Sequence, residues 1–211
     1  MMRRAPLTRA ILIVIALVYV GEFFAAQRML DAGAIVPGML AAHQYWRLIT
    51  SMFLHAPPQT PYGLGWVHVL ANSWAIFQLG ALYEVLFGSK RFALIYFVSG
   101  ICAGIASSFH IGTEGVGASG AVFGLLGAFI FSIWRSPQYR HQPWTKSLLG
   151  QIVFWTVVNL YIGMQFSFID NVAHIGGLVA GLLLGFIPHR VPPPSPARSV
   201  IDVHPYDEGR F

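Results

Sequence analysis

A chain of 211 residues that is 55% hydrophobic and only 10% charged, with a mean hydropathy of +0.61, has the composition of a membrane protein, which excludes an ordinary soluble domain. Its net charge of +5 would favour nucleic-acid binding in a soluble protein, but here the basic residues lie in short runs between apolar segments and indicate membrane topology. The one cysteine, Cys102, excludes an internal disulfide.

The first apolar segment follows a basic N-terminus and covers about residues 8–28. A cleaved signal peptide has a similar layout, but this apolar run is longer than usual and no convincing A-x-A cleavage site follows it. We therefore expect a retained transmembrane helix. The next stretch, 29–63, is too interrupted to span a bilayer, and we expect interfacial helical pieces in this long first loop.

Five further segments are apolar enough to span a bilayer, which takes roughly 20 residues. They cover residues 64–87, 91–110, 117–134, 148–165 and 171–188. The sequence thus predicts an all-α membrane protein with six transmembrane helices in one domain, residues 1–190. Residues 191–211 are rich in proline and lack apolar periodicity, which predicts a disordered tail.

The lysines and arginines predict the orientation of these helices. Of the 13 in the chain, all but two lie in the terminal segments and in alternate loops that share one side of the predicted bundle. The two exceptions, Arg28 and Arg47, belong to the first loop. The positive-inside rule then places both termini in the cytoplasm.

Polar side chains from three predicted helices lie at one depth, near the outer side of the membrane. Ser119 is in the first turn of the fourth segment, and His174 is about one turn into the sixth. His68 is about one turn into the second segment, and Asn72 lies one turn deeper on the same helical face. Polar groups inside a membrane are costly, so this cluster favours a functional site.

Glycines on two of these segments favour close helix packing. The sixth segment repeats glycine at every fourth position, and the fourth segment is also rich in it; the glycines are Gly177, Gly181 and Gly185, and Gly117, Gly120, Gly124 and Gly127. Small residues at this spacing let helix backbones approach closely. If these two faces meet, Ser119 and His174 come within hydrogen-bonding distance.

The chemistry that such a cluster permits is nucleophilic acyl transfer. His174 is the candidate base that activates the hydroxyl of Ser119, and later the acid that protonates the leaving amine. The backbone N–H of Ser119 and the side chains of His68 and Asn72 are candidate donors to the oxyanion. Taken singly, each residue also has a packing explanation, and only their joint occurrence favours catalysis.

Other polar residues are interpreted as structural or solvated. Asp170 lies one turn before His174 and has two interpretations, a triad carboxylate or a charge at a helix N-terminus, of which the second is favoured. Glu22 and Glu84 lie near opposite faces of the membrane and are expected to be structural. His55, in the first loop, is expected to be solvated.

At these residues the sequence resembles the rhomboid family of intramembrane serine proteases, over about residues 40–188. The motifs, in the family's order, are Trp46-Arg47, His68-x-x-x-Asn72, Gly117-Ala118-Ser119-Gly120 and Ala173-His174-x-x-Gly177. The resemblance implies a six-helix rhomboid bundle and a serine–histidine dyad that requires no carboxylate, metal or cofactor. It also implies transmembrane protein substrates, cut in a water-filled cavity that opens to the outside, and the same three oxyanion donors.

Further positions are assigned through the resemblance. Phe123 matches an aromatic position that packs against the catalytic histidine, and Trp46 and Arg47 match structural residues of the first loop. Gln44 stands near the place where an acidic residue is expected. The compact six-helix form resembles minimal bacterial rhomboids, which implies the bacterial inner membrane, with the site facing the periplasm and no nucleic-acid partner.

Two other functions stay open from the sequence. One is a non-catalytic rhomboid relative that binds membrane proteins, although such relatives usually lack the serine or the histidine. The other is a small transporter, which would need polar groups through the whole membrane thickness. Zinc and aspartyl intramembrane proteases are excluded because the sequence has no HExxH motif and no pair of intramembrane aspartates. Phe154 and Trp155 on the fifth segment suggest a lateral gate for substrate.

Overall fold

The computed structural model describes residues 2–55, 65–110 and 114–188. These residues are helical or form loops and turns, with one isolated antiparallel bridge between Ile35 and Gly115. The helices are η1 (Met2–Arg4), α1 (Pro6–Gly33), α2 (Arg47–Thr50), α3 (Gly65–Ala75), η2 (Ile76–Gly80), α4 (Ala81–Phe87), α5 (Ser89–Ser108), α6 (Ser119–Trp134), α7 (Pro143–Gln165) and α8 (Asn171–Phe186). The predicted tail, 191–211, lies outside the described residues.

Four membrane-span candidates are long and apolar enough to cross a bilayer: α1, the continuous helix Gly65–Phe87, α5 and α7. The two remaining predicted segments form α6 and α8, which are apolar but only 16 residues long. At 1.5 Å per residue such a helix measures about 24 Å, less than the roughly 30 Å of a hydrocarbon core. Both are shorter than predicted: α6 begins only at Ser119, and α8 ends before Pro188.

Two other helix boundaries differ from the prediction for a local reason. The helices α1 and α7 begin at Pro6 and Pro143, a few residues before the predicted starts at 8 and 148. Proline suits the first turn of a helix, where its missing N–H has no intrahelical partner to lose. In the first loop, one of the predicted helical pieces is found, the single turn α2.

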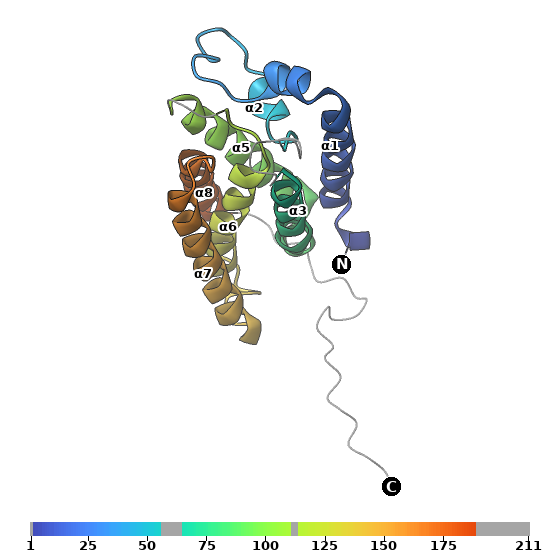
Figure 1. Ribbon diagram of the computed structural model, residues 1–211. Helices are drawn as coiled ribbons and strands as arrows, with labels where there is room; N and C mark the ends of the chain where they lie inside the picture. The colour runs from blue at the N-terminus through green and yellow to red at the C-terminus, as the bar shows by residue number, and fades with distance from the viewer. Residues whose placement is uncertain (1, 56–64, 111–113, 189–211) are drawn as a thin grey trace.

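The helix α6 lies at the centre of the bundle, and most of its side chains are buried. It packs against both α5 and α8, which also contact each other, while α1 lies on the other side of the molecule from α7 and α8 (Figure 1). Contact between α6 and α8 depends on glycine: a Cβ on Gly177 or Gly181 would collide with the carbonyl oxygens of Gly120 and Gly124. The predicted close approach of these two helices is confirmed.

At the end of the bundle that holds the N-terminus, Glu84 links three helices. Its carboxylate accepts the backbone N–H groups of Leu7 and Thr8 and the hydroxyls of Thr8 and Ser89. These bonds satisfy donors in the first turn of α1, which have no partners within the helix. Glu84 therefore has a structural role, as expected.

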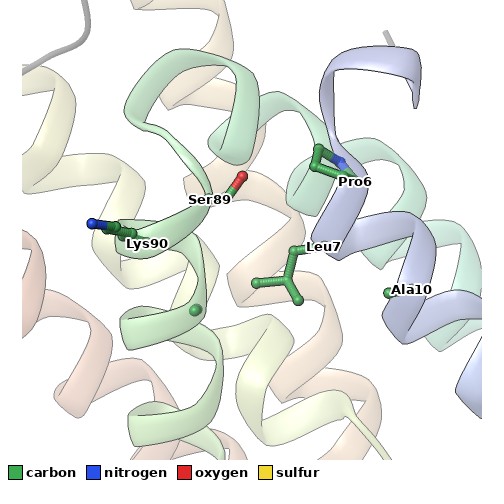
Figure 2. Close-up of a pocket in the computed structure, with 6 residues that line it drawn as sticks. Pro6, Leu7, Ala10, Ser89 and Lys90 are labelled. Carbon is green, nitrogen blue, oxygen red and sulfur yellow. The ribbon is translucent and has the colours of Figure 1, made fainter.

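A hollow of about 450 Å³ lies beside this linkage, between α1 and the start of α5. Figure 2 shows residues that line it, Pro6, Leu7 and Ala10 from α1 and Ser89 and Lys90 from α5. Ser89 is at the opposite end of α5 from Ser107, which contacts the α8 N-terminus. The hollow is thus separate from the cluster of Ser119 and His174.

Candidate active site

Ser119 and His174 are brought together by the packing of α6 against α8. Ser119 is the first residue of α6, and His174 lies in the first turn of α8. The Ser119 Oγ and the His174 Nε2 are hydrogen-bonded at 2.9 Å, although the residues are 55 positions apart. His174 is buried and Ser119 is half-buried. This is the geometry that a nucleophile and its base require.

Phe123 lies on the face of the His174 ring. The two ring centroids are 4.2 Å apart and the planes are nearly parallel, at 8°. The Nδ1 of His174 has no hydrogen-bond partner among the described residues. For Nε2 to accept the proton of Ser119, the single proton of the neutral ring must be on Nδ1. Stacking against Phe123 therefore helps to hold the orientation of the His174 ring, a role that a hydrogen bond from Nδ1 has no described partner to fill.

Asp170 does not take the place of a triad carboxylate. One of its oxygens accepts the N–H of Ala173 at 2.9 Å, and the other accepts the hydroxyl of Ser107 on α5. The side chain is the N-cap of α8, because an aspartate before a helix bonds most readily to the unpaired amides of its first turn. The triad interpretation of Asp170 is wrong for this structure.

His68 and Asn72 surround Gly117, two residues before Ser119. A Cβ on Gly117 would lie 2.6 Å from the His68 Nε2 and 3.6 Å from the Asn72 Nδ2. Gly117 has a φ of +114°, which other residues rarely adopt, and its N–H donates to the Ser51 carbonyl at 2.9 Å. The absence of a side chain here lets both polar groups approach the backbone that leads to Ser119.

The first loop is attached to the end of α1 through Arg47, which is buried. Its guanidinium donates to the carbonyls of Ala34 at 2.7 Å and Asp31 at 2.6 Å, and to Gln44 Oε1 at 2.6 Å. Gln44 therefore supplies a side-chain acceptor where the resemblance led us to expect a carboxylate. The indole of Trp46 donates to the Ala32 carbonyl at 3.0 Å, which adds a second attachment.

Sequence reasoning missed a hydrogen-bonded link that runs from Glu22 on α1 through His55 to His68. The Glu22 carboxylate accepts the backbone N–H of His55, at 3.0 and 3.1 Å from the two oxygens. The prediction that His55 is solvated is wrong, because its side chain is completely buried. The link passes through the backbone of a loop residue, so neither residue spacing nor helical periodicity signals it.

Burial governs the protonation of His55. It lowers the pKa of this histidine to about 3; the neighbouring His68 lowers it too, and the hydrogen bond with the Phe53 carbonyl opposes the shift. The ring is thus neutral at physiological pH. Its Nδ1 lies 3.0 Å from the Phe53 carbonyl oxygen and donates to it. His55 is therefore held at both its backbone and its side chain.

Comparisons with known proteins agree with this architecture. The rhomboid domain family model matches residues 42–191. Rhomboid protease GluP of Bacillus subtilis is 34% identical over 149 residues, which cover 71% of this chain but 27% of GluP. RHOMBOID-like protein 1 of Arabidopsis thaliana is 37% identical over 146 residues, or 69% of this chain and 35% of that protein.

A further relative is similar to this chain over most of its own length. The Bacillus subtilis protein YdcA is 35% identical over 150 residues, which cover 70% of this chain and 69% of YdcA. For GluP and RHOMBOID-like protein 1, the chain spans only about a quarter to a third of the relative's length. The family model and these identities, each extending over most of the chain, show that this multi-pass membrane protein belongs to the rhomboid family.

Proposed function

We propose that the protein is an intramembrane serine endopeptidase that hydrolyses peptide bonds in or near the transmembrane segments of membrane proteins. The observation that carries this proposal is the 2.9 Å contact between the Ser119 Oγ and the His174 Nε2. The contact joins a nucleophile and a base from two helices whose backbones pack in direct contact. The similarity to a protein named a rhomboid protease supports the same activity.

In the proposed reaction, the Ser119 Oγ attacks the carbonyl carbon of the scissile peptide bond while its proton passes to the His174 Nε2. A C–O bond forms, and the carbonyl electron pair moves onto the oxygen. As the tetrahedral intermediate collapses, the C–N bond breaks and the leaving nitrogen takes the proton from His174. Water then attacks the carbonyl carbon of the acyl-enzyme and gives a proton to His174. The ester C–Oγ bond breaks, the new carboxylic acid leaves, and the Ser119 Oγ takes the proton back from His174.

The oxyanion is stabilised by three donors. The Ser119 N–H is at the N-terminus of α6, where amides lack intrahelical partners. Asn72 uses one amide hydrogen to bond the His68 carbonyl at 3.1 Å, so its second is left for the oxyanion. His68 already donates from Nδ1 to the His55 carbonyl, so it donates from Nε2 only when its ring carries both protons. Phe123, Gly117, Trp46 and Arg47 support this site without taking part in the bonds that form and break.

The proposed topology has six spans, 8–28, 64–87, 91–110, 117–134, 148–165 and 171–188, with both termini in the cytoplasm. The domain covers 1–190, and 191–211 is a cytoplasmic tail. The distribution of lysine and arginine supports this orientation, which places the dyad near the periplasmic face of a bacterial inner membrane. The short α6 and α8 begin below that face, so the dyad at their N-termini is reached by water.

Substrates enter the site from the lipid beside α7. This helix contributes few buried residues to the bundle, and Phe154 and Trp155 on it are more than half exposed. Their bulky side chains control entry in this proposal. Small replacements at both positions are expected to change the cleavage rate of a membrane-embedded substrate, and an unchanged rate would exclude this gate.

The test is to label the purified protein with a fluorophosphonate and to measure cleavage of transmembrane substrates. Ser119→Ala and His174→Ala are expected to abolish both readouts while the thermal unfolding of the protein stays cooperative. The matched control is Ser99→Ala, since the Ser99 hydroxyl is buried and has no hydrogen-bond partner among the described residues. A folded wild-type protein that neither labels at Ser119 nor cleaves would instead support a non-catalytic protein that binds membrane proteins.

A further inference from the structure

We propose that Glu22 is a positioning residue for the oxyanion hole, which holds the backbone of His55 so that the His55 carbonyl orients His68. The inference rests on the proposed peptidase function, because it assigns a role to His68 in that reaction. Glu22 does not touch the dyad. It acts through two hydrogen bonds in series: the His55 N–H donates to Glu22, and the His55 carbonyl accepts from His68.

The first hydrogen bond fixes the peptide N–H of His55. Glu22 is completely buried on α1, and both of its carboxylate oxygens lie within 3.1 Å of the His55 nitrogen. A buried carboxylate is costly unless donors compensate it, and a loop N–H at this depth is costly unless it has an acceptor. Each group therefore satisfies the other, across 33 positions of sequence.

The second hydrogen bond fixes the ring of His68. The His68 Nδ1 lies 3.0 Å from the His55 carbonyl oxygen, and a carbonyl only accepts, so the proton of the neutral ring is on Nδ1. The Nε2 then faces the backbone at Gly117. The His55 and His68 rings also lie against each other, with centroids 5.3 Å apart. The direction of the His68 ring thus depends on where the His55 carbonyl lies. The same carbonyl keeps its hydrogen bond from Nδ1 when the ring carries both protons, which is the form that donates to the oxyanion from Nε2.

Removing Glu22 leaves the His55 N–H without its carboxylate acceptor and lets this part of the loop move. The His68 Nδ1–H then loses its acceptor, which disfavours the doubly protonated ring that donates to the oxyanion, and its Nε2 moves away from Gly117. The loss affects the transition state, in which the oxyanion exists, more than the ground state of bound substrate. A reduced kcat with little change in KM is therefore expected.

The test is a double-mutant cycle in the full-length protein, with cleavage of a transmembrane substrate as the readout. Glu22→Ala is expected to lower kcat about tenfold or more, as a misplaced catalytic group does, with KM changed by less than about twofold. In the His68→Ala background, the same substitution is expected to lower kcat by less than about twofold, because its target is gone. Glu22→Gln keeps one acceptor oxygen and is expected to restore most of kcat.

Thr8→Val is the matched control, since it removes a buried hydrogen bond at the other end of α1. It is expected to lower thermal stability without changing kcat per folded molecule. If Glu22→Ala does not fold, Glu22→Asp, which withdraws the carboxylate by one methylene, replaces it in the cycle with the same expected coupling. Equal losses of kcat in both backgrounds would overturn the inference.

A second readout does not depend on proteolysis. The ¹⁵N resonances of the His68 ring distinguish the protonated from the bare nitrogen, and they are assigned by their loss in His68→Ala. In the wild type, the proton is expected on Nδ1; in Glu22→Ala, the resonances are expected to shift toward a mixture of tautomers. Unchanged resonances would contradict the inference even if the enzyme is active. If the wild type cleaves no substrate but the His68 resonances still differ between the wild type and Glu22→Ala, the result contradicts the peptidase function and not the Glu22 link.

Discussion

The ring of Phe123 stacks on the ring of His174 with centroids 4.2 Å apart, and Phe123 is one helical turn after Ser119. The helix α6 therefore supplies both the proposed nucleophile and the surface that sets the plane of its base. The His174 Nδ1 has no described partner, so the ring is held by this stacking and by the hydrogen bond between its Nε2 and Ser119. The Ser119 and His174 side chains can thus be held in place without a third residue that carries a charge.

Loss of the Phe123 ring is expected to slow catalysis. Phe123→Ala removes a stacked pair worth about 0.5–1.5 kcal/mol, so we expect kcat to fall about two- to tenfold as His174 samples other orientations. Phe123→Tyr keeps the ring and is expected to retain most of the activity. The measurement is the kinetics of cleavage of one transmembrane substrate. Equal activity of the alanine and tyrosine variants would show that stacking does not orient the base.

Substitution of Asp170 is expected to affect stability more than chemistry. Asp170→Asn keeps an N-cap acceptor for the Ala173 N–H and is expected to retain most of kcat at its optimal pH. Asp170→Ala removes the cap and is expected to lower stability by about 1 kcal/mol. Thermal unfolding and a pH–rate profile measure the two effects. A large loss of kcat in folded Asp170→Asn would restore the triad interpretation.

The glycine contacts between α6 and α8 are expected to tolerate no side chain. A Cβ on Gly181 would collide with the Gly124 carbonyl, so we expect Gly181→Ala to cost about 1–3 kcal/mol through displacement of the helices. The same displacement separates Ser119 from His174 and lowers fluorophosphonate labelling. Gly150→Ala on α7 is the control, because a Cβ there has no neighbour within 4 Å. The higher helix propensity of alanine favours both variants alike, so equal stability of the two would mean that the contact at Gly181 does not limit the packing.

The buried His55 is expected to make the fold sensitive to acid. Its pKa of about 3 lies below the ordinary value of 6.5, so between these values the unfolded chain binds a proton that the folded chain does not. Stability therefore falls as the pH decreases through this window. Thermal unfolding at about pH 7 and about pH 5 should show a larger loss for the wild type than for His55→Gln. Identical losses would mean that His55 is also protonated in the folded protein.

The elements that repeat with helical periodicity were predictable because their signal is local. His68 and Asn72 are four residues apart, which places them on one face of any α-helix, and the glycines at every fourth position predict a close contact before its partner helix is known. The short lengths of α6 and α8 were harder to predict. The apolar run continues across Gly117, and only its positive φ shows that the helix has not yet begun.

The membrane class, the helical periodicity and the residues available for chemistry could be predicted from composition and spacing, which follow directly from the order of the side chains. The N-cap role of Asp170 was favoured for the same reason, because its bond to Ala173 is local. The contacts between distant groups could not be predicted: Ser107 on α5 bonds the second oxygen of Asp170, and Glu22 accepts the N–H of His55. Both depend on how the helices and the first loop pack. In the second, the donor is a backbone N–H, which every residue except proline carries and which no side-chain pattern encodes.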